Sequence, residues 1–238
     1  MRAVTLFCLP HAGGSVLAYR QWGARAPAHV SVRAVELPGR GARMPEPLVD
    51  DFDQLVTLLA GEVGAVISSA RDGEVRARYA LFGHSFGSLL AFELARILRD
   101  RFGEPTALLV SGRNGPAIPA AAPFLHDQPD AGLLRGLAAF GGTDDRIMAD
   151  AEMRALFLPI VRADLKLAET YRRAPAEPLG CPISVYSGLS DRLVDPAGLA
   201  AWRQETTGPV SVREFRGGHF YLAGDRFPAE FLTSARLA

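Results

Sequence analysis

One serine of the sequence lies in a setting that suits a nucleophile. Residues 83–87 have the sequence Gly-His-Ser-Phe-Gly, which matches the pattern Gly-x-Ser-x-Gly. An apolar run precedes this pattern and a Leu-rich stretch follows it, so the sequence predicts a strand, a tight turn and a helix. Glycines flank the serine because such a turn has no room for side chains, and the hydroxyl stands beside the positive end of the helix. We therefore predict that Ser85 is a catalytic nucleophile.

A serine hydroxyl needs a general base within reach, because it is inert at its own pKa. Behind a turn of this kind, the acid and then the histidine follow the serine along the chain. His219 comes directly after the last predicted strand, and the two glycines before it let the loop turn back. Asp191 lies in the loop after the preceding strand, whereas Asp195 is followed by Pro196 and is better explained as a helix cap. The predicted catalytic triad is Ser85, Asp191 and His219.

Attack by serine on a carbonyl creates an oxyanion, which needs backbone N–H donors. The N–H of Phe86, the residue after the nucleophile, is the first predicted donor. The second donor should come from a loop after an early strand, and residues 10–14 have the sequence Pro-His-Ala-Gly-Gly at such a place. We predict the N–H of Ala12 as this donor; the alternative is an ordinary Gly-rich turn.

The elements that must position these residues follow a regular order. Short apolar runs alternate with longer amphipathic stretches, which predicts β-α units around a mostly parallel sheet flanked by helices. Helices are expected over residues 51–67, capped by Asp51, and from Phe86 to about Arg101. With the serine turn, this order predicts an α/β-hydrolase fold, one domain over residues 1–238. The predicted strands are Val4–Leu9, Ser31–Val35, Tyr79–Gly83, Thr106–Ser111, Ile183–Ser187 and Val210–Phe215.

One connection is much longer than the others. No strand is predicted between Gly112 and Pro182, but helical periodicity predicts a helical lid insertion over about 124–171. Pro159 should kink the second helical stretch or begin a new helix there. Asp164 falls on the apolar face of that stretch, where an unpaired carboxylate would be costly. Either an ion pair or cap holds the lid through Asp164, or this carboxylate faces the substrate chamber.

Composition limits the partners. Of the 238 residues, 48% are hydrophobic, while 26 basic and 26 acidic side chains balance, so the basic footprint of a nucleic-acid-binding protein is missing. No apolar stretch approaches the ~18–20 residues of a membrane span, and the N-terminal apolar run is too short for a secretory signal. Cys8 and Cys181 are expected to be free buried thiols, which favours a cytoplasmic protein. We expect a monomer with no metal and no diffusible cofactor.

Five segments, in this order, resemble the type II thioesterases, the free-standing editing enzymes of polyketide synthases and nonribosomal peptide synthetases. They are residues 7–14, 36–41, 83–87, 158–164 and 217–220. The resemblance extends over almost the whole chain. It implies hydrolysis of aberrant or stalled acyl groups from the phosphopantetheine arm of an acyl or peptidyl carrier protein. The catalytic residues of the family match Ser85, Asp191 and His219, and its oxyanion donors match Ala12 and Phe86.

Three alternatives use the same fold. An esterase or lipase acting on small or lipid esters would have the same triad, so the triad does not discriminate. A non-catalytic binding protein is disfavoured by the complete set of catalytic residues. Release of a product by cyclisation is usually performed by a domain fused to a synthase, and this sequence contains no carrier-protein domain.

Overall fold

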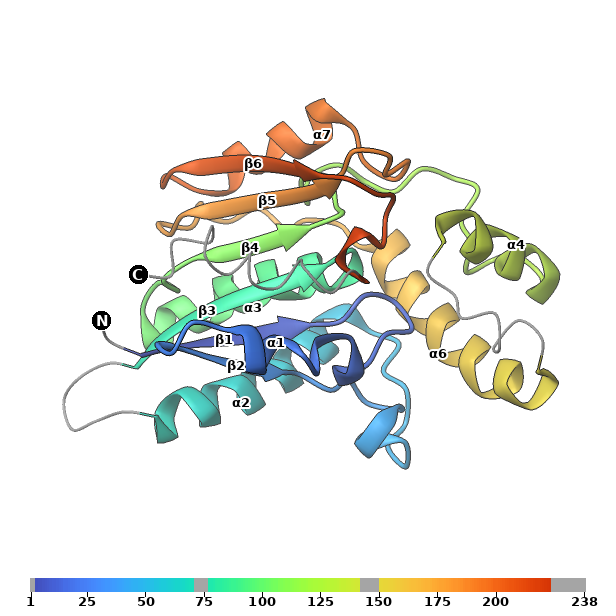
Figure 1. Cartoon of the computed structure of the whole chain (residues 1–238), viewed down its shortest axis with the longest axis horizontal. Helices are drawn as coiled ribbons and strands as arrows, with labels where there is room; N and C mark the ends of the chain where they lie inside the picture. Colours follow the sequence, from blue (N-terminus) through green and yellow to red (C-terminus); the bar gives the residue numbers. More distant parts are fainter. Residues whose placement is uncertain (1–2, 71–76, 142–149, 224–238) are drawn as a thin grey trace.

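The computed structural model describes residues 3–70, 77–141 and 150–223 (Figure 1). Its sheet has the strand order β2-β1-β3-β4-β5-β6, and every pair of neighbouring strands is parallel. All six predicted strands are confirmed, with ends that move by two residues at most. The strands are β1 (Val4–Leu9), β2 (Val30–Ala34), β3 (Arg78–His84), β4 (Leu108–Ser111), β5 (Ile183–Gly188) and β6 (Val210–Phe215).

The predicted helices are also present. Asp51 caps α2, because its Oδ1 accepts a hydrogen bond of 2.7 Å from the N–H of Gln54. None of the described helices combines the length and the apolar character needed to cross a membrane. The α-helices are α1 (Trp22–Arg25), α2 (Phe52–Ser69), α3 (Phe86–Phe102), α4 (Asp130–Phe140), α6 (Ala151–Thr170) and α7 (Pro196–Ala200). The 3₁₀-helices are η1 (Val16–Tyr19), η2 (Gly41–Arg43), η3 (Ala201–Glu205) and η4 (Tyr221–Ala223).

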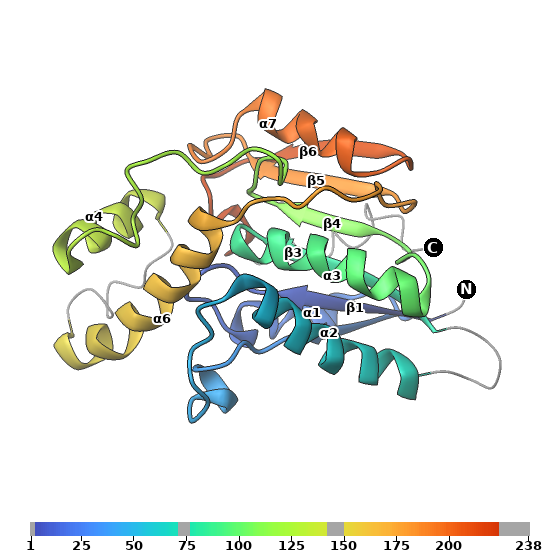
Figure 2. The same ribbon diagram turned by 180° about the vertical axis from the view of Figure 1, so that it is seen from behind.

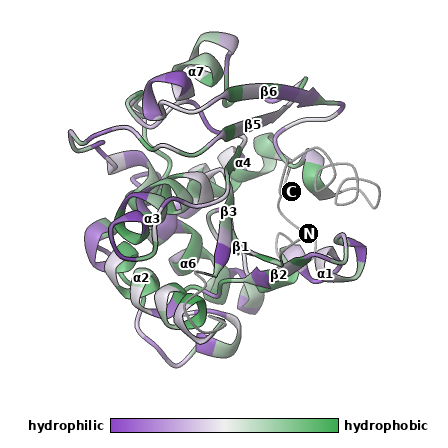
Figure 3. Ribbon diagram, turned by 90° about the vertical axis from the view of Figure 1, so that its left-hand side faces the viewer, coloured by the Kyte–Doolittle hydropathy of each residue, from purple (hydrophilic) through white to green (hydrophobic). Residues whose placement is uncertain are grey.

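Side chains of β1 alternate between two hydrophobic cores, one on each face of the sheet. Phe7 and Leu9 belong to the cluster that α2 and α3 complete, whereas Leu6 and Cys8 pack with Trp22 of α1 on the other face. Figure 3 shows α2 and α3 on one side of the sheet and α1 on the other. Successive side chains of a strand point to opposite faces, so a strand covered on both faces is apolar throughout. The four inner strands β1, β3, β4 and β5 are almost entirely buried, whereas most residues of the edge strand β6 are exposed.

The helices of the predicted lid insertion lie beyond the carboxyl ends of the strands (Figures 1 and 2). Residues 142–149 of the insertion fall outside the described residues. The expectation that a new helix begins at Pro159 is wrong, since α6 runs through it. Proline forfeits one helical hydrogen bond. Its neighbours Leu158 and Val161 are buried against Leu133 of α4, and this packing offsets the loss.

Candidate active site

Ser85 occupies the predicted turn between β3 and α3. Its φ of 55° and ψ of −115° lie outside the usual regions, and no other non-glycine residue of the described chain has a positive φ. Such a conformation costs about 1–3 kcal/mol and persists only where its surroundings enforce it. A Cβ on Gly83 would collide with the backbone of Gly87, and one on Gly87 would collide with the carbonyl oxygen of Leu9. The turn therefore requires both glycines, as predicted.

Hydrogen bonds to β4 hold this turn in place. The N–H of Ser85 donates to the carbonyl oxygen of Ser111 at 2.7 Å. The hydroxyl of Ser88, one turn into α3, donates to the carbonyl oxygens of Gly83 and Ser111 at 2.9 and 3.0 Å. These hydrogen bonds fix the turn at Ser85 and the start of α3 to the central strands β3 and β4. The strained conformation is over-determined, and the serine itself stays partly exposed.

Asp191 and His219 come together as predicted. The Nδ1 of His219 lies 2.8 Å from Oδ2 of Asp191, and both side chains are buried. The other carboxylate oxygen accepts a hydrogen bond of 2.9 Å from the N–H of Leu193. Because an ionised carboxylate only accepts, it keeps the proton of the imidazole on Nδ1 and leaves Nε2 free to act as a base. Asp195 caps α7 instead, accepting from the N–H of Gly198 at 2.9 Å, which confirms its predicted role.

Four of the five predicted site residues line a cavity of about 470 Å³. Ser85, His219, Ala12 and Phe86 all line it, while Asp191 lies behind the histidine. The hydroxyl of Ser85 makes no hydrogen bond to the described part of the chain, a common state of catalytic groups without substrate. A larger cavity of about 600 Å³ lies between β2 and α2, away from these residues. The predicted nucleophile and the predicted base therefore line one chamber.

Some backbone N–H groups near the predicted oxyanion donors already donate hydrogen bonds within the protein. The N–H of Gly13 donates to Oδ2 of Asp164 at 2.8 Å, and the N–H of Gly14 donates to the carbonyl oxygen of His11 at 2.8 Å. Apart from the regular bonds of helices and strands, the N–H groups of Ala12 and Phe86 have no partner in the described residues. Both are thus free to serve as oxyanion donors at the wall of the chamber.

Two further histidines, His11 and His84, lie close to His219. The ring of His84 lies 4.8 Å from that of His219 and 5.9 Å from that of His11. Nδ1 of His84 is 2.9 Å from the hydroxyl of Ser111, which in turn is 2.5 Å from that of Tyr221. Burial and the neighbouring His219 lower the pKa of His11 to about 4 and hold the pKa of His84 well below its ordinary value. Both rings are therefore neutral at pH 7.

The lid insertion forms the apolar wall of the chamber. Arg113 and Glu169 add polar groups to this wall. An apolar wall with few polar groups suits an acyl chain. No group of three or more His, Cys, Asp or Glu side chains that could hold a metal ion occurs in residues 3–70, 77–141 and 150–223. The apolar lining from this insertion and the segment before it includes Ile118, Pro119, Pro123, Leu125, Leu137, Phe140 and Leu165.

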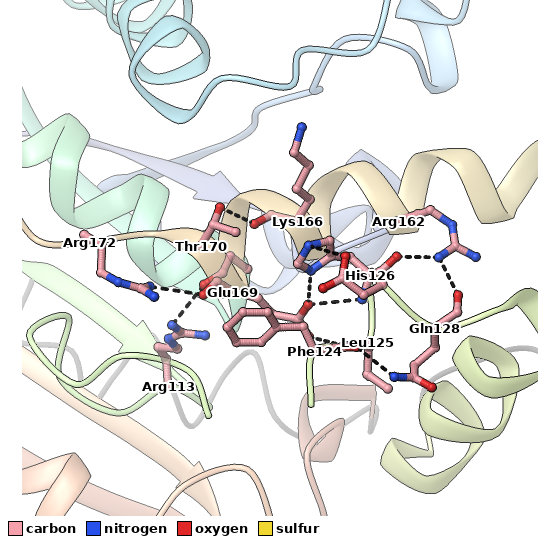
Figure 4. A network of polar contacts seen from close by, with 12 residues as sticks. Arg113, Phe124, Leu125, His126, Gln128, Arg162, Lys166, Glu169, Thr170 and Arg172 are labelled. Atoms are coloured by element: carbon pink, nitrogen blue, oxygen red, sulfur yellow. Dashed lines mark hydrogen bonds and ion pairs between the residues drawn. The ribbon is translucent and has the colours of Figure 1, made fainter. Parts of the chain in front are cut away.

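Polar contacts fasten the start of the lid insertion to α6, as Figure 4 shows. Glu169 accepts hydrogen bonds from the N–H groups of Leu125 and His126 at 3.0 and 3.1 Å, and it contacts Nδ1 of His126 at 2.5 Å. Arg162 donates to the carbonyl oxygen of His126 and forms an ion pair of 2.6 Å with Asp130 at the start of α4. Sequence reasoning missed this network, because residues 124–142 carry no motif.

Asp164 forms the buried ion pair that was one of its two predicted roles. Its carboxylate binds Arg40, and neither residue lines the chamber. The alternative, a carboxylate facing the substrate chamber, is wrong. Sequence reasoning gave no role to Arg40, although it lies within one of the five resembling segments.

The fold and the site together define a class of enzyme. A parallel sheet that carries a serine on a strained strand-to-helix turn, with an Asp–His pair at the same edge, is a serine hydrolase of the α/β-hydrolase fold. Its lid-covered chamber is the place where a substrate acyl group would lie.

Comparison with known proteins gives the family. The Thioesterase domain model matches residues 4–234. Thioesterase PikA5 of Streptomyces venezuelae is 38% identical over 221 residues, which cover 92% of this chain and 76% of PikA5. The structure of the type II thioesterase BorB from the borrelidin biosynthetic cluster has a TM-score of 0.87 and 37% identity, covering 99% of this chain and 93% of that chain. YbtT, a type II thioesterase from the yersiniabactin NRPS/PKS biosynthetic pathway, has a TM-score of 0.85 and 30% identity, covering 98% and 91%.

The chain belongs to the thioesterase family. The predicted resemblance to type II thioesterases is confirmed, as are the α/β-hydrolase fold and the assignment as a serine hydrolase.

Proposed function

We propose that this thioesterase hydrolyses aberrant or stalled acyl groups from the phosphopantetheine arm of acyl or peptidyl carrier proteins in polyketide or nonribosomal peptide assembly lines. The observation that carries the proposal is the meeting of Ser85 and the Asp191–His219 pair in one lid-covered chamber. The relatives named as type II thioesterases of biosynthetic clusters support the choice of substrate.

Acylation transfers the acyl group to Ser85. As its Oγ attacks the thioester carbonyl, His219 takes the hydroxyl proton, and Asp191 orients the imidazole and stabilises its charged form. The N–H groups of Phe86 and Ala12 bind the developing oxyanion. The C–S bond then breaks, the imidazolium returns the proton to the leaving pantetheine sulfur, and the acyl group remains as an ester of Ser85.

Deacylation uses the same groups with water as the nucleophile. His219 removes a proton from the water as its oxygen attacks the ester carbonyl, and the same two N–H groups bind the second oxyanion. Breakage of the C–O bond releases the carboxylic acid, while the proton on His219 returns to the Oγ of Ser85. This chemistry requires no metal or cofactor of the enzyme, because the phosphopantetheine belongs to the carrier protein.

The setting of the enzyme is also part of the proposal. Cys8 and Cys181 are free and buried, which suits a compartment where thiols stay reduced, so we assign the protein to the cytoplasm. We assign it as a monomer that meets carrier proteins one at a time, with neither nucleic acid nor membrane as a partner.

The alternative functions differ in what they hydrolyse or bind. An esterase or lipase would act on small or lipid esters with the same triad and would spare a loaded carrier protein. A binding protein would leave Ser85 unreactive toward a fluorophosphonate probe. A cyclising enzyme would release a ring that is 18 mass units lighter than the hydrolysed acid.

Intact-protein mass spectrometry tests the proposal. Acyl-loaded carrier protein is incubated with the enzyme, with the Ser85→Ala variant as control. We expect the carrier to lose its acyl mass with the wild type alone, and removal of the nucleophile should lower the rate about 10⁵-fold or more. If the loaded carrier survives while simple esters are hydrolysed, the carrier-protein assignment is wrong and the esterase alternative is favoured.

A further inference from the structure

A buried ion pair connects the lid helix α6 to the segment that follows β2. Nη1 and Nη2 of Arg40 contact Oδ2 and Oδ1 of Asp164 at 2.5 and 2.8 Å, so the pair is bidentate. Arg40 is 5% exposed and Asp164 is 2% exposed. The two residues are 124 positions apart in the sequence, and each belongs to a different segment of the fold. The pair therefore acts between elements that no local pattern connects.

The same carboxylate holds the loop that carries the second predicted oxyanion donor. Oδ2 of Asp164 accepts a hydrogen bond of 2.8 Å from the N–H of Gly13, and Nη1 of Arg40 donates to the carbonyl oxygen of Gly14 at 3.3 Å. Gly13 has a φ of +73°, and a Cβ on it would lie 2.9 Å from Cε2 of Phe157 on α6. The backbone of Gly13 thus packs directly against side chains of the lid helix, with no room for a side chain of its own.

These contacts determine which amides of the loop remain available. The N–H of Gly13 is directed to Asp164, and the N–H of Gly14 closes a turn onto His11. The N–H of Ala12 is left without a partner in the described residues. Because a peptide unit is planar, the hydrogen bond from Gly14 to the carbonyl oxygen of His11 also fixes the direction of the Ala12 N–H, which belongs to the same peptide unit. The ion pair holds the backbone of Gly13 and Gly14, and through the turn from Gly14 onto His11 it restricts the direction of the Ala12 N–H.

Stability alone accounts poorly for this ion pair. A buried pair gains little over apolar side chains of similar volume, because both charges lose their hydration. Nε of Arg40 is buried and has no hydrogen-bond partner in the described chain, which adds a further cost. A buried charge pair with an unsatisfied donor is more easily explained by a need for one fixed geometry.

We propose that Arg40 and Asp164 are positioning residues that set the second oxyanion donor by fixing the Gly13 amide against α6. The proposal rests on the proposed function, in which the N–H of Ala12 binds the oxyanion. It makes the lid helix part of the oxyanion hole rather than only a cover of the chamber. Neither residue touches the substrate, so both act through the loop.

Three variants test this role. Asp164→Asn removes the charge at nearly unchanged volume, and Arg40→Lys keeps the charge but loses the bidentate geometry. Glu205→Gln is the matched control, because Glu205 is also 2% exposed and pairs with Arg173 at 2.7 Å, away from the chamber. The readouts are kcat per active site and KM with a short acyl N-acetylcysteamine thioester. Active sites are counted by the mass shift that a fluorophosphonate adds, so unfolded enzyme does not enter kcat.

Asp164→Asn is expected to lower kcat per active site about 10- to 100-fold with KM within about threefold, as for a misplaced oxyanion donor. Arg40→Lys should lower kcat in the same way by a smaller factor, and Glu205→Gln should leave kcat unchanged. An unchanged kcat in Arg40→Lys and Asp164→Asn, or an equal loss in the control, would overturn the proposal. If Asp164→Asn does not fold, Arg40→Lys decides. A wild type that cleaves no thioester would instead contradict the proposed function.

Discussion

The two walls of the chamber are held by different kinds of interaction. The wall formed by the sheet presents Ser85 on a turn marked by its two flanking glycines and held by hydrogen bonds to the neighbouring strand β4. The wall formed by the lid is held by charged side chains that join distant segments, through Arg40–Asp164 and through Glu169 with residues 125–126. The wall formed by the sheet is thus marked by a short motif and held by backbone contacts, whereas the wall formed by the lid depends on pairings of charged or polar groups that no motif marks. Substitutions on the two walls should therefore have different consequences.

The largest effect is expected from Gly87→Ala in the wall formed by the sheet. The new Cβ would collide with the carbonyl oxygens of Leu9 and Pro10, which are rigid backbone atoms of β1 and the loop after it. We expect a loss of about 3 kcal/mol or more in the free energy of unfolding, together with loss of the reactive serine conformation. Urea denaturation and fluorophosphonate labelling of Ser85 measure the two effects.

Gly61→Ala in α2 is the matched control, because a Cβ there meets nothing within 4 Å. In a helix interior this change should stabilise the protein slightly, by about 0.5–1 kcal/mol. A Gly87→Ala variant as stable and as reactive as the control would show that the turn is not fixed by the backbone.

Lowering the pH should destabilise the folded protein, because His11 in the wall formed by the sheet is neutral there. The pKa of His11 is about 4 in the folded protein, below its ordinary value of 6.5, because burial and the neighbouring His219 and Arg40 disfavour its charged form. The unfolded chain therefore binds more protons between these pH values, so stability falls as pH decreases from about 6.5 to 4. The loss from this one group should reach about 2–3 kcal/mol in the free energy of unfolding.

Denaturation of His11→Asn at the same pH values measures the contribution of this group. The variant should show a shallower decrease in stability between pH 6.5 and 4 than the wild type. Equal slopes would mean that His11 is protonated in the folded protein and that its burial does not govern its charge.

A smaller effect is expected from Glu169→Gln in the lid wall. The two backbone hydrogen bonds go to different carboxylate oxygens, so the single amide oxygen can keep only one of them, and the charge that meets His126 is lost; stability should fall by about 1–2 kcal/mol. Because Glu169 holds the segment that lines the acyl chamber, KM should rise several-fold while kcat changes less. Steady-state kinetics with a medium-chain acyl thioester measures this split. A tenfold or larger loss of kcat with an unchanged KM would mean that the lid acts on the chemical step here as well.

The contrast between the walls also explains what could be predicted from the sequence. The turn at Ser85, the six strands and the Asp191–His219 pair follow from motifs and periodicities that each occupy a few residues. Sequence reasoning placed Asp164 on an apolar face and predicted an ion pair as one role, but it could not choose between the two roles. The partner, Arg40, is 124 residues away, and only the folded chain brings the two together.

The network of Glu169 was missed for the same reason. Its partners at residues 125–126 are backbone N–H groups, which every residue except proline possesses, so no residue type marks them. Helix α6 also continues through Pro159 because packing outweighs one lost hydrogen bond, and local propensity does not include that packing.

In the proposed mechanism, an acyl group passes from a carrier protein to Ser85 before water releases it. The most direct test mixes the enzyme with acyl-loaded carrier protein, quenches the reaction within milliseconds and locates the acyl mass by peptide mapping. We expect a transient acyl ester on the peptide that contains Ser85, absent from Ser85→Ala and formed far more slowly in His219→Ala. Release of the free acid by Ser85→Ala at the rate of the wild type, or an acyl group on any other residue, would contradict this mechanism.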